Sequence, residues 1–177
     1  ALEILKEEWG GLFSIDLINT VPGQTVEKAI SDIKRIDKFE PEHISLYNLT
    51  FEKSTKLYSM LESGKLTPIS DKMDSEMQRE SINLLKSLGY DRYEISNFSK
   101  PGKQSLHNLN YWRMGSYIGV GPSAASTLLS ESGPLRLSYK RSTSNFISDL
   151  SIEDKLDIEI ITYNSFSVIL FEVLRIY

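Results

Sequence analysis

The sequence contains no cysteine. With none among its 177 residues, the chain by itself cannot form a disulfide, a thiolate zinc site or a cysteine-held iron–sulfur cluster. It also lacks a run of about eighteen apolar residues, which excludes a membrane-spanning helix on hydropathy. The first residues are charged and lack the apolar stretch of a signal peptide. We therefore expect a soluble, cytoplasmic protein with no integral membrane segment.

Charge of one sign is not concentrated anywhere in the sequence. The 20 Lys and Arg residues and 24 Asp and Glu residues give a net charge of −4, without a long run of either sign. Charge alone therefore gives no reason to expect a nucleic-acid partner. A hydrophobic share of 40% and this length suit one globular domain. Because the chain opens inside a helical pattern without methionine and closes on an uncapped apolar segment, we expect a fragment cut at both ends.

The first half of the sequence predicts a βαβ unit. Residues 12–21 are rich in Ile, Leu, Phe and Val and end at a Pro-Gly turn, which is typical of a buried strand. Thr25 is placed to cap a helix over residues 26–39, whose apolar side chains have helical spacing. A second strand follows over residues 43–50. Such units are almost always right-handed parallel crossovers.

The rest of the sequence extends this series. Residues 51–71 form a polar excursion, residues 71–89 have helical spacing and end at Gly89, and residues 90–98 alternate as a third strand. From Arg136 onward the sequence is helical in character. The predicted fold class is α/β, with parallel strands, flanking helices and a helical carboxyl-terminal segment, as in part of a (β/α) barrel.

Asp16 is the first candidate site residue. A carboxylate inside an apolar strand is costly unless it is paired or faces a ligand, and ligands of parallel sheets lie at the carboxyl ends of strands. The alternative is that Asp16 faces solvent on an edge strand or caps the next turn. The residues alone leave both interpretations open.

The second candidate is the stretch HNLNYW, residues 107–112. Its imidazole suits a metal or haem iron and its aromatic rings suit a flat ligand. Composition alone favours an aromatic corner that anchors a loop to the core. The run GVGPSA at 119–124 lacks the lysine of a P-loop and the spacing of a dinucleotide fingerprint, so we expect a tight strand-to-helix turn there.

Five ordered blocks carry a family resemblance. They are SIDLINTVPGQT (14–25), PEHISLYNLT (41–50), GYDRYEISNFSKPG (89–102), HNLNYW (107–112) and YIGVGPSAAS (117–126). In order and spacing they resemble the oxygen-independent coproporphyrinogen III oxidase-like radical S-adenosylmethionine (SAM) family, most of all its haem-chaperone branch. The resemblance covers about residues 2–130 and is weak beyond them.

The resemblance implies a partial (β/α) barrel over residues 1–130 and the start of a helical region over 131–177. It implies an intact protein that uses a [4Fe–4S] cluster and S-adenosylmethionine in porphyrin or haem metabolism, with haem or porphyrin and a haem-acceptor protein as partners. The positions that match the family's S-adenosylmethionine contacts are Asp16, Thr50 and Ala125. The haem candidates in the distinctive box are His107, Asn108, Tyr111 and Trp112.

Two departures from the family pattern are visible. Residues 19–22 read Asn-Thr-Val-Pro where the pattern has Tyr-Gly-Leu-Pro, which is expected to alter the turn over the cofactor. The three-cysteine loop that holds the family's cluster is absent, because the chain has no cysteine. We therefore expect this chain alone to be catalytically inactive.

Two other functions stay open on the sequence. One is a true coproporphyrinogen III oxidase, which decarboxylates propionates and needs basic partners for them, such as Lys100, Lys103 and Arg113 near the box. The other is a non-catalytic α/β remnant whose unpaired strand edge recruits a partner.

Overall fold

The structure is a computed structural model that describes residues 2–130, 133–139, 143–147 and 156–160. The chain divides into two compact units, Ala1–Gln104 and Ser105–Tyr177. We expect the barrel of the longer family protein to end near residue 130. The division into two compact units does not test that boundary, so it stays a prediction.

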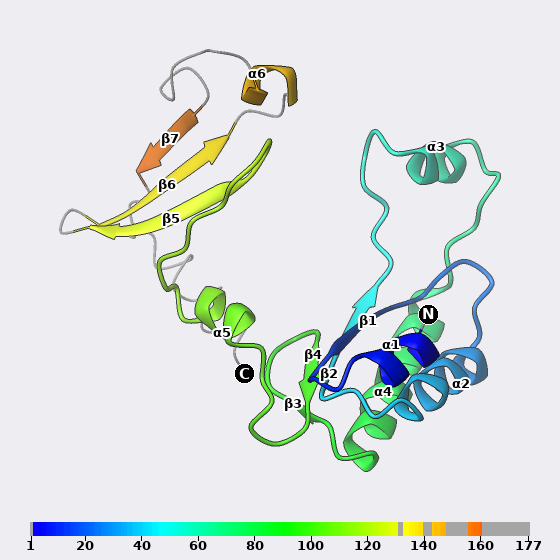
Figure 1. Cartoon of the computed structure of the whole chain (residues 1–177). Helices are drawn as coiled ribbons and strands as arrows, with labels where there is room; N and C mark the ends of the chain where they lie inside the picture. The colour runs from blue at the N-terminus through cyan, green and yellow to red at the C-terminus, as the bar shows by residue number, and fades with distance from the viewer. Residues whose placement is uncertain (1, 131–132, 140–142, 148–155, 161–177) are drawn as a thin grey trace. The chain divides into compact units, whose positions relative to one another are not determined.

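Unit 1 is an α/β unit with one four-stranded sheet of order β1-β2-β4-β3 (Figure 1). Its strands are β1 (Ser14–Asn19), β2 (His43–Asn48), β3 (Asp91–Arg92) and β4 (Asn97–Ser99). Its helices are α1 (Leu2–Glu8), α2 (Val26–Asp37), α3 (Lys56–Glu62) and α4 (Asp71–Ser87).

The predicted βαβ unit is confirmed by β1, α2 and β2. The two strands are parallel, with Asp16 opposite Ser45 in the register. Thr25 caps α2 as expected, because its hydroxyl accepts the backbone N–H of Lys28 at 3.3 Å. The polar excursion after β2 contains the short helix α3.

The third predicted strand, residues 90–98, is wrong as a single parallel strand. Instead β3 and β4 form an antiparallel hairpin, and β4 also pairs antiparallel with β2. The turn between them is held locally. Arg92 Nη2 donates to the carbonyl oxygen of Ile95 at 2.7 Å, and the Glu94 carboxylate accepts the backbone N–H of Ser96 at 2.7 Å. These side-chain bonds favour a turn over a continued strand.

The core of unit 1 lies on one face of the sheet. Side chains of α2, α4, β2 and β4 form it, together with Tyr90 after α4: Ile33, Ile36, Ile44, Leu46, Leu85, Tyr90 and Phe98. Ile15 and Leu17 of β1 pack against this cluster. Since successive strand residues point to opposite faces, Asp16 lies on the other face of the sheet.

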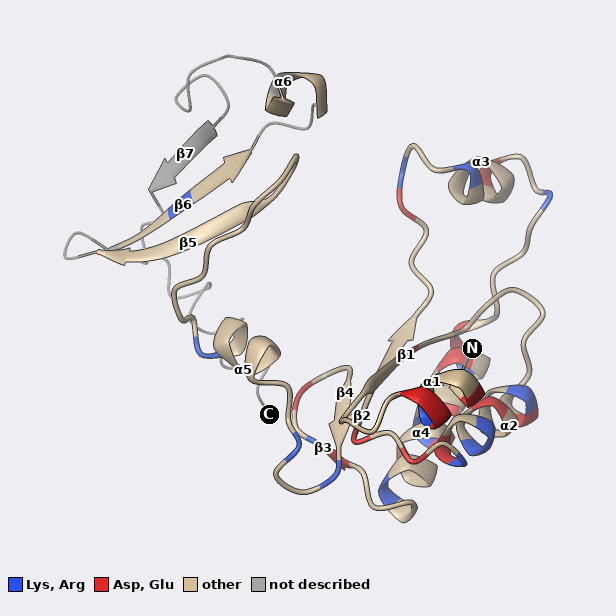
Figure 2. Cartoon of the chain, in the orientation of Figure 1, with Lys and Arg blue, Asp and Glu red and all other residues tan. Residues whose placement is uncertain are grey.

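Charged residues of both signs are interspersed along α2 and α4 (Figure 2). In α2, for example, Glu27 and Asp32 alternate along the sequence with Lys28, Lys34 and Arg35. These helices therefore present mixed charge, which is typical of a solvated helix surface.

Unit 2 contains α5 (Leu106–Trp112), β5 (Ala125–Ser130), β6 (Gly133–Tyr139), α6 (Thr143–Ile147) and β7 (Leu156–Ile160). The three strands form an antiparallel sheet of order β5-β6-β7. The helical character expected from Arg136 onward is met by α6, but β6 and β7 are strands, so that part of the expectation was wrong. The expected helix over residues 161–177 lies outside the described residues.

The Gly-rich run at 119–124 does not lead into a helix. It folds back so that Tyr117 bridges Thr127 of β5, with backbone bonds of 2.8 and 3.0 Å. A Cβ atom on Gly119 would overlap the backbone carbonyl of Ala125. The expected strand-to-helix turn is therefore corrected to a loop whose glycine permits close packing against a strand.

Candidate functional site

A row of polar side chains crosses the sheet of unit 1 on the face opposite the core. The register places Asp16 of β1, Ser45 of β2 and Asn97 of β4 in one line. Asp16 is exposed, whereas Ser45 and Asn97 are 4% and 5% exposed. We call this side of the sheet the polar face. Asp16 is the exposed anion of this row. Its strand, β1, packs Ile15 and Leu17 against the core on the opposite face of the sheet.

A second polar row lies beside the first and contains a buried histidine. Ser14 pairs with His43, and His43 pairs with Ser99. His43 is 6% exposed, and both of its ring nitrogens have hydroxyl partners. Nδ1 lies 2.8 Å from Ser14 Oγ, and Nε2 lies 2.7 Å from the hydroxyl of Tyr93. The imidazole thus joins β1 to the β3–β4 turn.

Burial lowers the pKa of His43 below its ordinary value of 6.5, while the negative charges of Asp16 and Glu94 act in the opposite direction. Burial is the larger effect, so the imidazole is neutral at pH 7. A neutral imidazole donates from one nitrogen and accepts at the other, and hydroxyl groups serve as partners for both.

Two polar atoms on the polar face lack a hydrogen-bond partner among the described residues. They are Asn97 Oδ1 and Ser99 Oγ, both buried. Buried polar atoms are nearly always hydrogen-bonded, so these two atoms are exceptions in the described part of the chain. Asn97 stands in the row of Asp16, two strands away, with Ser45 of β2 between them.

Thr50 lies just beyond the carboxyl end of β2 and is exposed. The chain before it is tied to the end of β1, because the backbone N–H of Leu49 donates to the carbonyl of Asn19 and to the hydroxyl of Thr20, both at 2.9 Å. Asp16 therefore lies within β1, whereas Thr50 lies beyond the end of the adjacent parallel strand β2, five residues past Ser45, the partner of Asp16. Ala125 lies in unit 2, at the start of β5, so its approach to these two residues stays a prediction.

The turn after β1 has a left-handed residue that is not glycine. Thr20 stands where the family pattern has glycine, and its φ is +64°. A β-branched side chain is unfavourable there by roughly 1–2 kcal/mol. The Thr20 hydroxyl, which accepts the Leu49 N–H, offsets part of that cost. The departure from the family pattern thus places threonine in a conformation that glycine adopts freely.

The HNLNYW box forms most of α5, whose first turn is capped by Ser105. The exposed Tyr111 ring packs edge-on against His107 at 4.6 Å and against Tyr117 at 4.5 Å between ring centroids. His107 is exposed, whereas Asn108 and Trp112 are half-buried. The box is therefore a short helix with an accessible imidazole beside aromatic rings, which fits a planar ligand with a metal centre.

Exposed apolar side chains accompany this helix in unit 2. Leu106 is 80% exposed, and Ile118 and Val120 are 77% and 81% exposed. Exposed apolar side chains are common singly on protein surfaces, so these three by themselves do not define a binding surface.

The residues present do not suit an iron–sulfur cluster. The chain has no cysteine, and its described part holds no group of three or more His, Cys, Asp or Glu residues arranged for a metal. No described helix is long and apolar enough to cross a bilayer.

Two open grooves in unit 1 lie between helices, and a third lies at the turn between β1 and α2. One lies between α2 and α4 and includes Val26, Ile30 and Leu84; another, between α1 and α2, includes Leu2 and Arg35. Neither of these two grooves is lined by residues of the polar rows.

Sequence reasoning found Asp16 but missed His43, Glu94 and Asn97. Alternation was the available signal: in HISLY the polar side chains of His43 and Ser45 alternate with Ile44 and Leu46. That pattern predicts one apolar and one polar face for β2. Which polar residues share the face with Asp16 depends on strand register, which the sequence does not state.

No family model matches the chain. Individual proteins do. The chain is 39% identical over 114 residues to "Radical S-adenosyl methionine domain-containing protein 1, mitochondrial" of Danio rerio, covering 64% of the chain and 26% of that protein. It is 34% identical over 150 residues to "Heme chaperone HemW" of Escherichia coli (strain K12), covering 83% of the chain and 38% of that protein.

A solved structure has the same fold. Coproporphyrinogen III oxidase (HemN) from Escherichia coli, described as a radical SAM enzyme, superimposes with a TM-score of 0.60 and 19% identity. The match covers 80% of the chain and 34% of HemN. The chain thus spans between about a quarter and two fifths of the length of these proteins. The predicted α/β fold of a partial radical SAM barrel is confirmed, and the chain belongs to the coproporphyrinogen III oxidase-like radical SAM family, in its HemW haem-chaperone branch.

Proposed function

We propose that this chain is part of a radical SAM haem chaperone in which unit 1 contacts S-adenosylmethionine and α5 contacts haem. The observation that carries the proposal is the exposed carboxylate of Asp16 on the polar face, at the motif position of the family's cofactor-binding aspartate. Relatives named haem chaperone, at 34% to 38% identity, support the haem part.

The chemistry of the site suits S-adenosylmethionine. A carboxylate accepts hydrogen bonds from the ammonium and hydroxyl groups of this cofactor, and charge-assisted bonds of this kind are strong. Small side chains such as Thr50 and Ala125 leave room for a flat base. Radical cleavage of the cofactor needs an electron from a [4Fe–4S] cluster, for which this chain has no thiolates.

Calorimetric titration of the chain with S-adenosylmethionine tests the cofactor part. We expect Asp16→Asn to weaken binding about tenfold, because a charged hydrogen bond contributes ~1.5 kcal/mol or more. Asp71→Asn is the matched control, since it removes one exposed carboxylate from α4. Equal affinities for Asp16→Asn and the unaltered chain would refute the role of Asp16.

Haem titration followed at the Soret band tests α5. We propose that His107 would bind the haem iron, with Tyr111, whose ring packs against it, and with Asn108 and Trp112 as further haem contacts. His107→Ala is expected to abolish the Soret shift, and added free imidazole is expected to restore it. A Soret band that stays at its free-haem position with the unaltered chain would show that the box is only an aromatic corner.

Coproporphyrinogen III oxidation is the second candidate activity. The fold of HemN, whose name states this activity, is the observation in its favour, but at 19% identity it supports the fold alone. Product analysis with coproporphyrinogen III and a full-length protein that contains this sequence distinguishes an oxidase from a chaperone. The cytoplasmic location stays a prediction, since a relative carries a mitochondrial name.

A further inference from the structure

His43 is the buried titratable group closest in register to Asp16 that the proposed function does not use. Asp16 pairs with Ser45, and His43 precedes Ser45 by two residues in β2, so both side chains lie on the polar face as diagonal neighbours. His43 is 6% exposed, so its ring nitrogens are hydrogen-bonded to protein groups rather than to bulk water.

The hydrogen bonds of His43 suit both of its charge states. Ser14 Oγ lies at 2.8 Å from Nδ1 and the Tyr93 hydroxyl at 2.7 Å from Nε2. A hydroxyl group donates or accepts by rotating its hydrogen. The imidazolium, which donates from both nitrogens, therefore keeps both partners. Protonation changes the charge of this site without requiring the ring to move.

The charges that act on His43 come from both elements packed beside it. Asp16 stands on β1, and Glu94 lies in the β3–β4 turn, next to the titratable hydroxyl of Tyr93. Glu94 is 6% exposed and its carboxylate accepts the backbone N–H of Ser96 at 2.7 Å. Asp16, in contrast, is exposed. Of the two anions, Asp16 is the one that a ligand can reach.

We propose that His43 sets the charge of the polar face and thereby selects a cationic ligand for Asp16. With neutral imidazole, Asp16 acts as an uncompensated anion toward the ammonium and sulfonium groups of a ligand such as S-adenosylmethionine. With imidazolium, the same carboxylate already has a positive neighbour, so a cation binds more weakly. His43 is thus a specificity-determining residue that acts through Asp16, and this inference rests on the proposed function.

The coupling is tested first without ligand, by NMR titration of the imidazole signals. The chain has two histidines, His43 and the exposed His107, so His107→Gln assigns both signals and His107 serves as the reference. We expect Asp16→Asn to shift the titration of His43 to lower pH and to leave His107 unchanged. An unchanged His43 midpoint would overturn the proposal.

The ligand is then titrated between pH 5 and pH 7, with S-adenosylmethionine as the cationic probe and adenosine as the neutral one. We expect the affinity for S-adenosylmethionine to fall about threefold to tenfold toward pH 5, as charges ~7 Å apart near a protein surface predict, and that for adenosine to stay constant. His43→Gln is expected to abolish the pH dependence. Tyr93→Phe keeps the imidazole but removes the hydroxyl next to Nε2, so we expect it to shift the pH midpoint of the affinity change.

The outcomes separate the two hypotheses. If S-adenosylmethionine does not bind at pH 7, the proposed function of Asp16 fails and this inference fails with it. If it binds at pH 7 with an affinity that is the same at pH 5, the proposed function stands and the role of His43 is overturned. A pH dependence that persists in His43→Gln also overturns that role. If His43→Gln does not fold, Tyr93→Phe takes its place. A shift in the pH midpoint of S-adenosylmethionine affinity then supports the role of His43, and an unchanged midpoint overturns it.

Discussion

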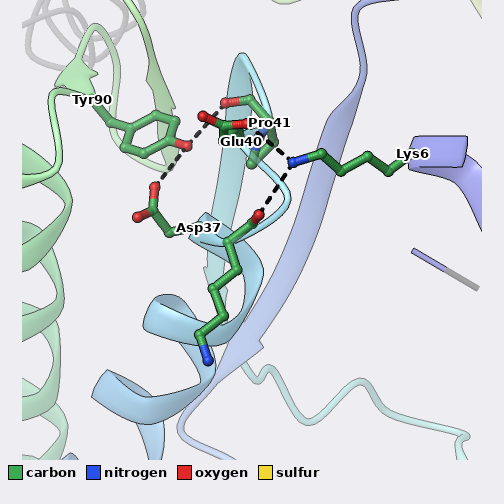
Figure 3. A network of polar contacts seen from close by, with 6 residues as sticks. Lys6, Asp37, Glu40, Pro41 and Tyr90 are labelled. Atoms are coloured by element: carbon green, nitrogen blue, oxygen red, sulfur yellow. Dashed lines mark hydrogen bonds and ion pairs between the residues drawn. The ribbon is translucent and has the colours of Figure 1, made fainter. Parts of the chain in front are cut away.

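Replacing Tyr90 by phenylalanine removes one buried hydroxyl group from the core of unit 1. The ring is fully buried, and the hydroxyl shares its hydrogen between the carbonyl of Pro41, at 2.9 Å, and the carboxylate of Asp37, at 3.2 Å (Figure 3). Pro41 is itself fully buried. The hydroxyl therefore links the segment after α4 to the end of α2 and the approach to β2.

The expected loss of stability follows from these two acceptors. A neutral hydrogen bond contributes about 0.5–1.5 kcal/mol, and one to a charged group about 1.5–3 kcal/mol. The hydroxyl has one hydrogen to share, and the buried carbonyl of Pro41 loses this donor. We therefore expect Tyr90→Phe to lower the free energy of unfolding by about 2 kcal/mol. Tyr47→Phe, at a residue 41% exposed, is the control with little expected loss.

Urea unfolding followed by far-ultraviolet circular dichroism measures the loss, with an unchanged urea slope as a check on two-state behaviour. Lys6→Ala gives a useful contrast in the same region. Its 3.0 Å ion pair with Glu40 (Figure 3) joins side chains that are 47% and 72% exposed, so we expect almost no change. A loss below about 0.5 kcal/mol for Tyr90→Phe would refute the assignment of stability to the buried hydroxyl.

The same residue predicts a pH dependence. Burial, and then the nearby Asp37 carboxylate, raise the pKa of Tyr90 above its ordinary value of 10.0. The unfolded chain ionises this phenol near pH 10 while the folded chain keeps it neutral. The free energy of unfolding therefore falls as the pH rises above 10, and Tyr90→Phe is expected to lack this contribution.

Three further predictions concern the cap, the buried histidine and the close glycine. Thr25→Ala removes the α2 cap and is expected to cost about 1 kcal/mol in urea unfolding, whereas Thr25→Ser keeps the cap. Burial lowers the pKa of His43, so near pH 6.5 the unfolded chain binds a proton more readily than the folded chain does. The free energy of unfolding is therefore expected to fall as the pH drops below 6.5, and to fall less in His43→Gln. Gly119→Ala places a Cβ against the Ala125 carbonyl and is expected to accelerate amide hydrogen exchange at Thr127, while an unchanged rate would contradict that packing.

The elements that the sequence predicts correctly are those with local determinants. Helix α2 follows from the Thr25 cap and from apolar residues at helical spacing, and β1 and β2 follow from short apolar runs next to turn residues. The β3–β4 hairpin was missed because its turn depends on bonds of Arg92 and Glu94 to nearby backbone groups. No periodicity reports such bonds.

Strand β6 shows a different kind of error. Leu135, Leu137 and Tyr139 alternate with Arg136 and Ser138, which is the pattern of a strand, whereas we predict helical character from Arg136 onward. The period was present but the segment boundary was misplaced. Its pairing with β5 and β7 joins segments that are separate in the sequence, so periodicity within the segment does not predict it.

The candidate site shows the same limit. Asp16 could be singled out because a carboxylate in an apolar strand is unusual, and the family motif gave it a role. His43 and Asn97 could not, because 27 and 81 residues separate them from Asp16 in the sequence and only the register places them on one face. Polar residues are common in strands that face solvent. Their burial, which makes these two unusual, is known only from the fold.

The two faces of the unit 1 sheet make opposite contributions to stability. The core face buries Ile44, Leu46 and Phe98, which stabilise the fold through the hydrophobic effect. On the polar face, Asn97 Oδ1 and Ser99 Oγ are buried without a partner among the described residues, as Asn19 Oδ1 is on the core side, and each such atom costs about 1–3 kcal/mol. That is a large share of the ~5–15 kcal/mol of a typical domain. A face built for stability alone would carry apolar side chains there, so the polar rows are not explained by their contribution to stability.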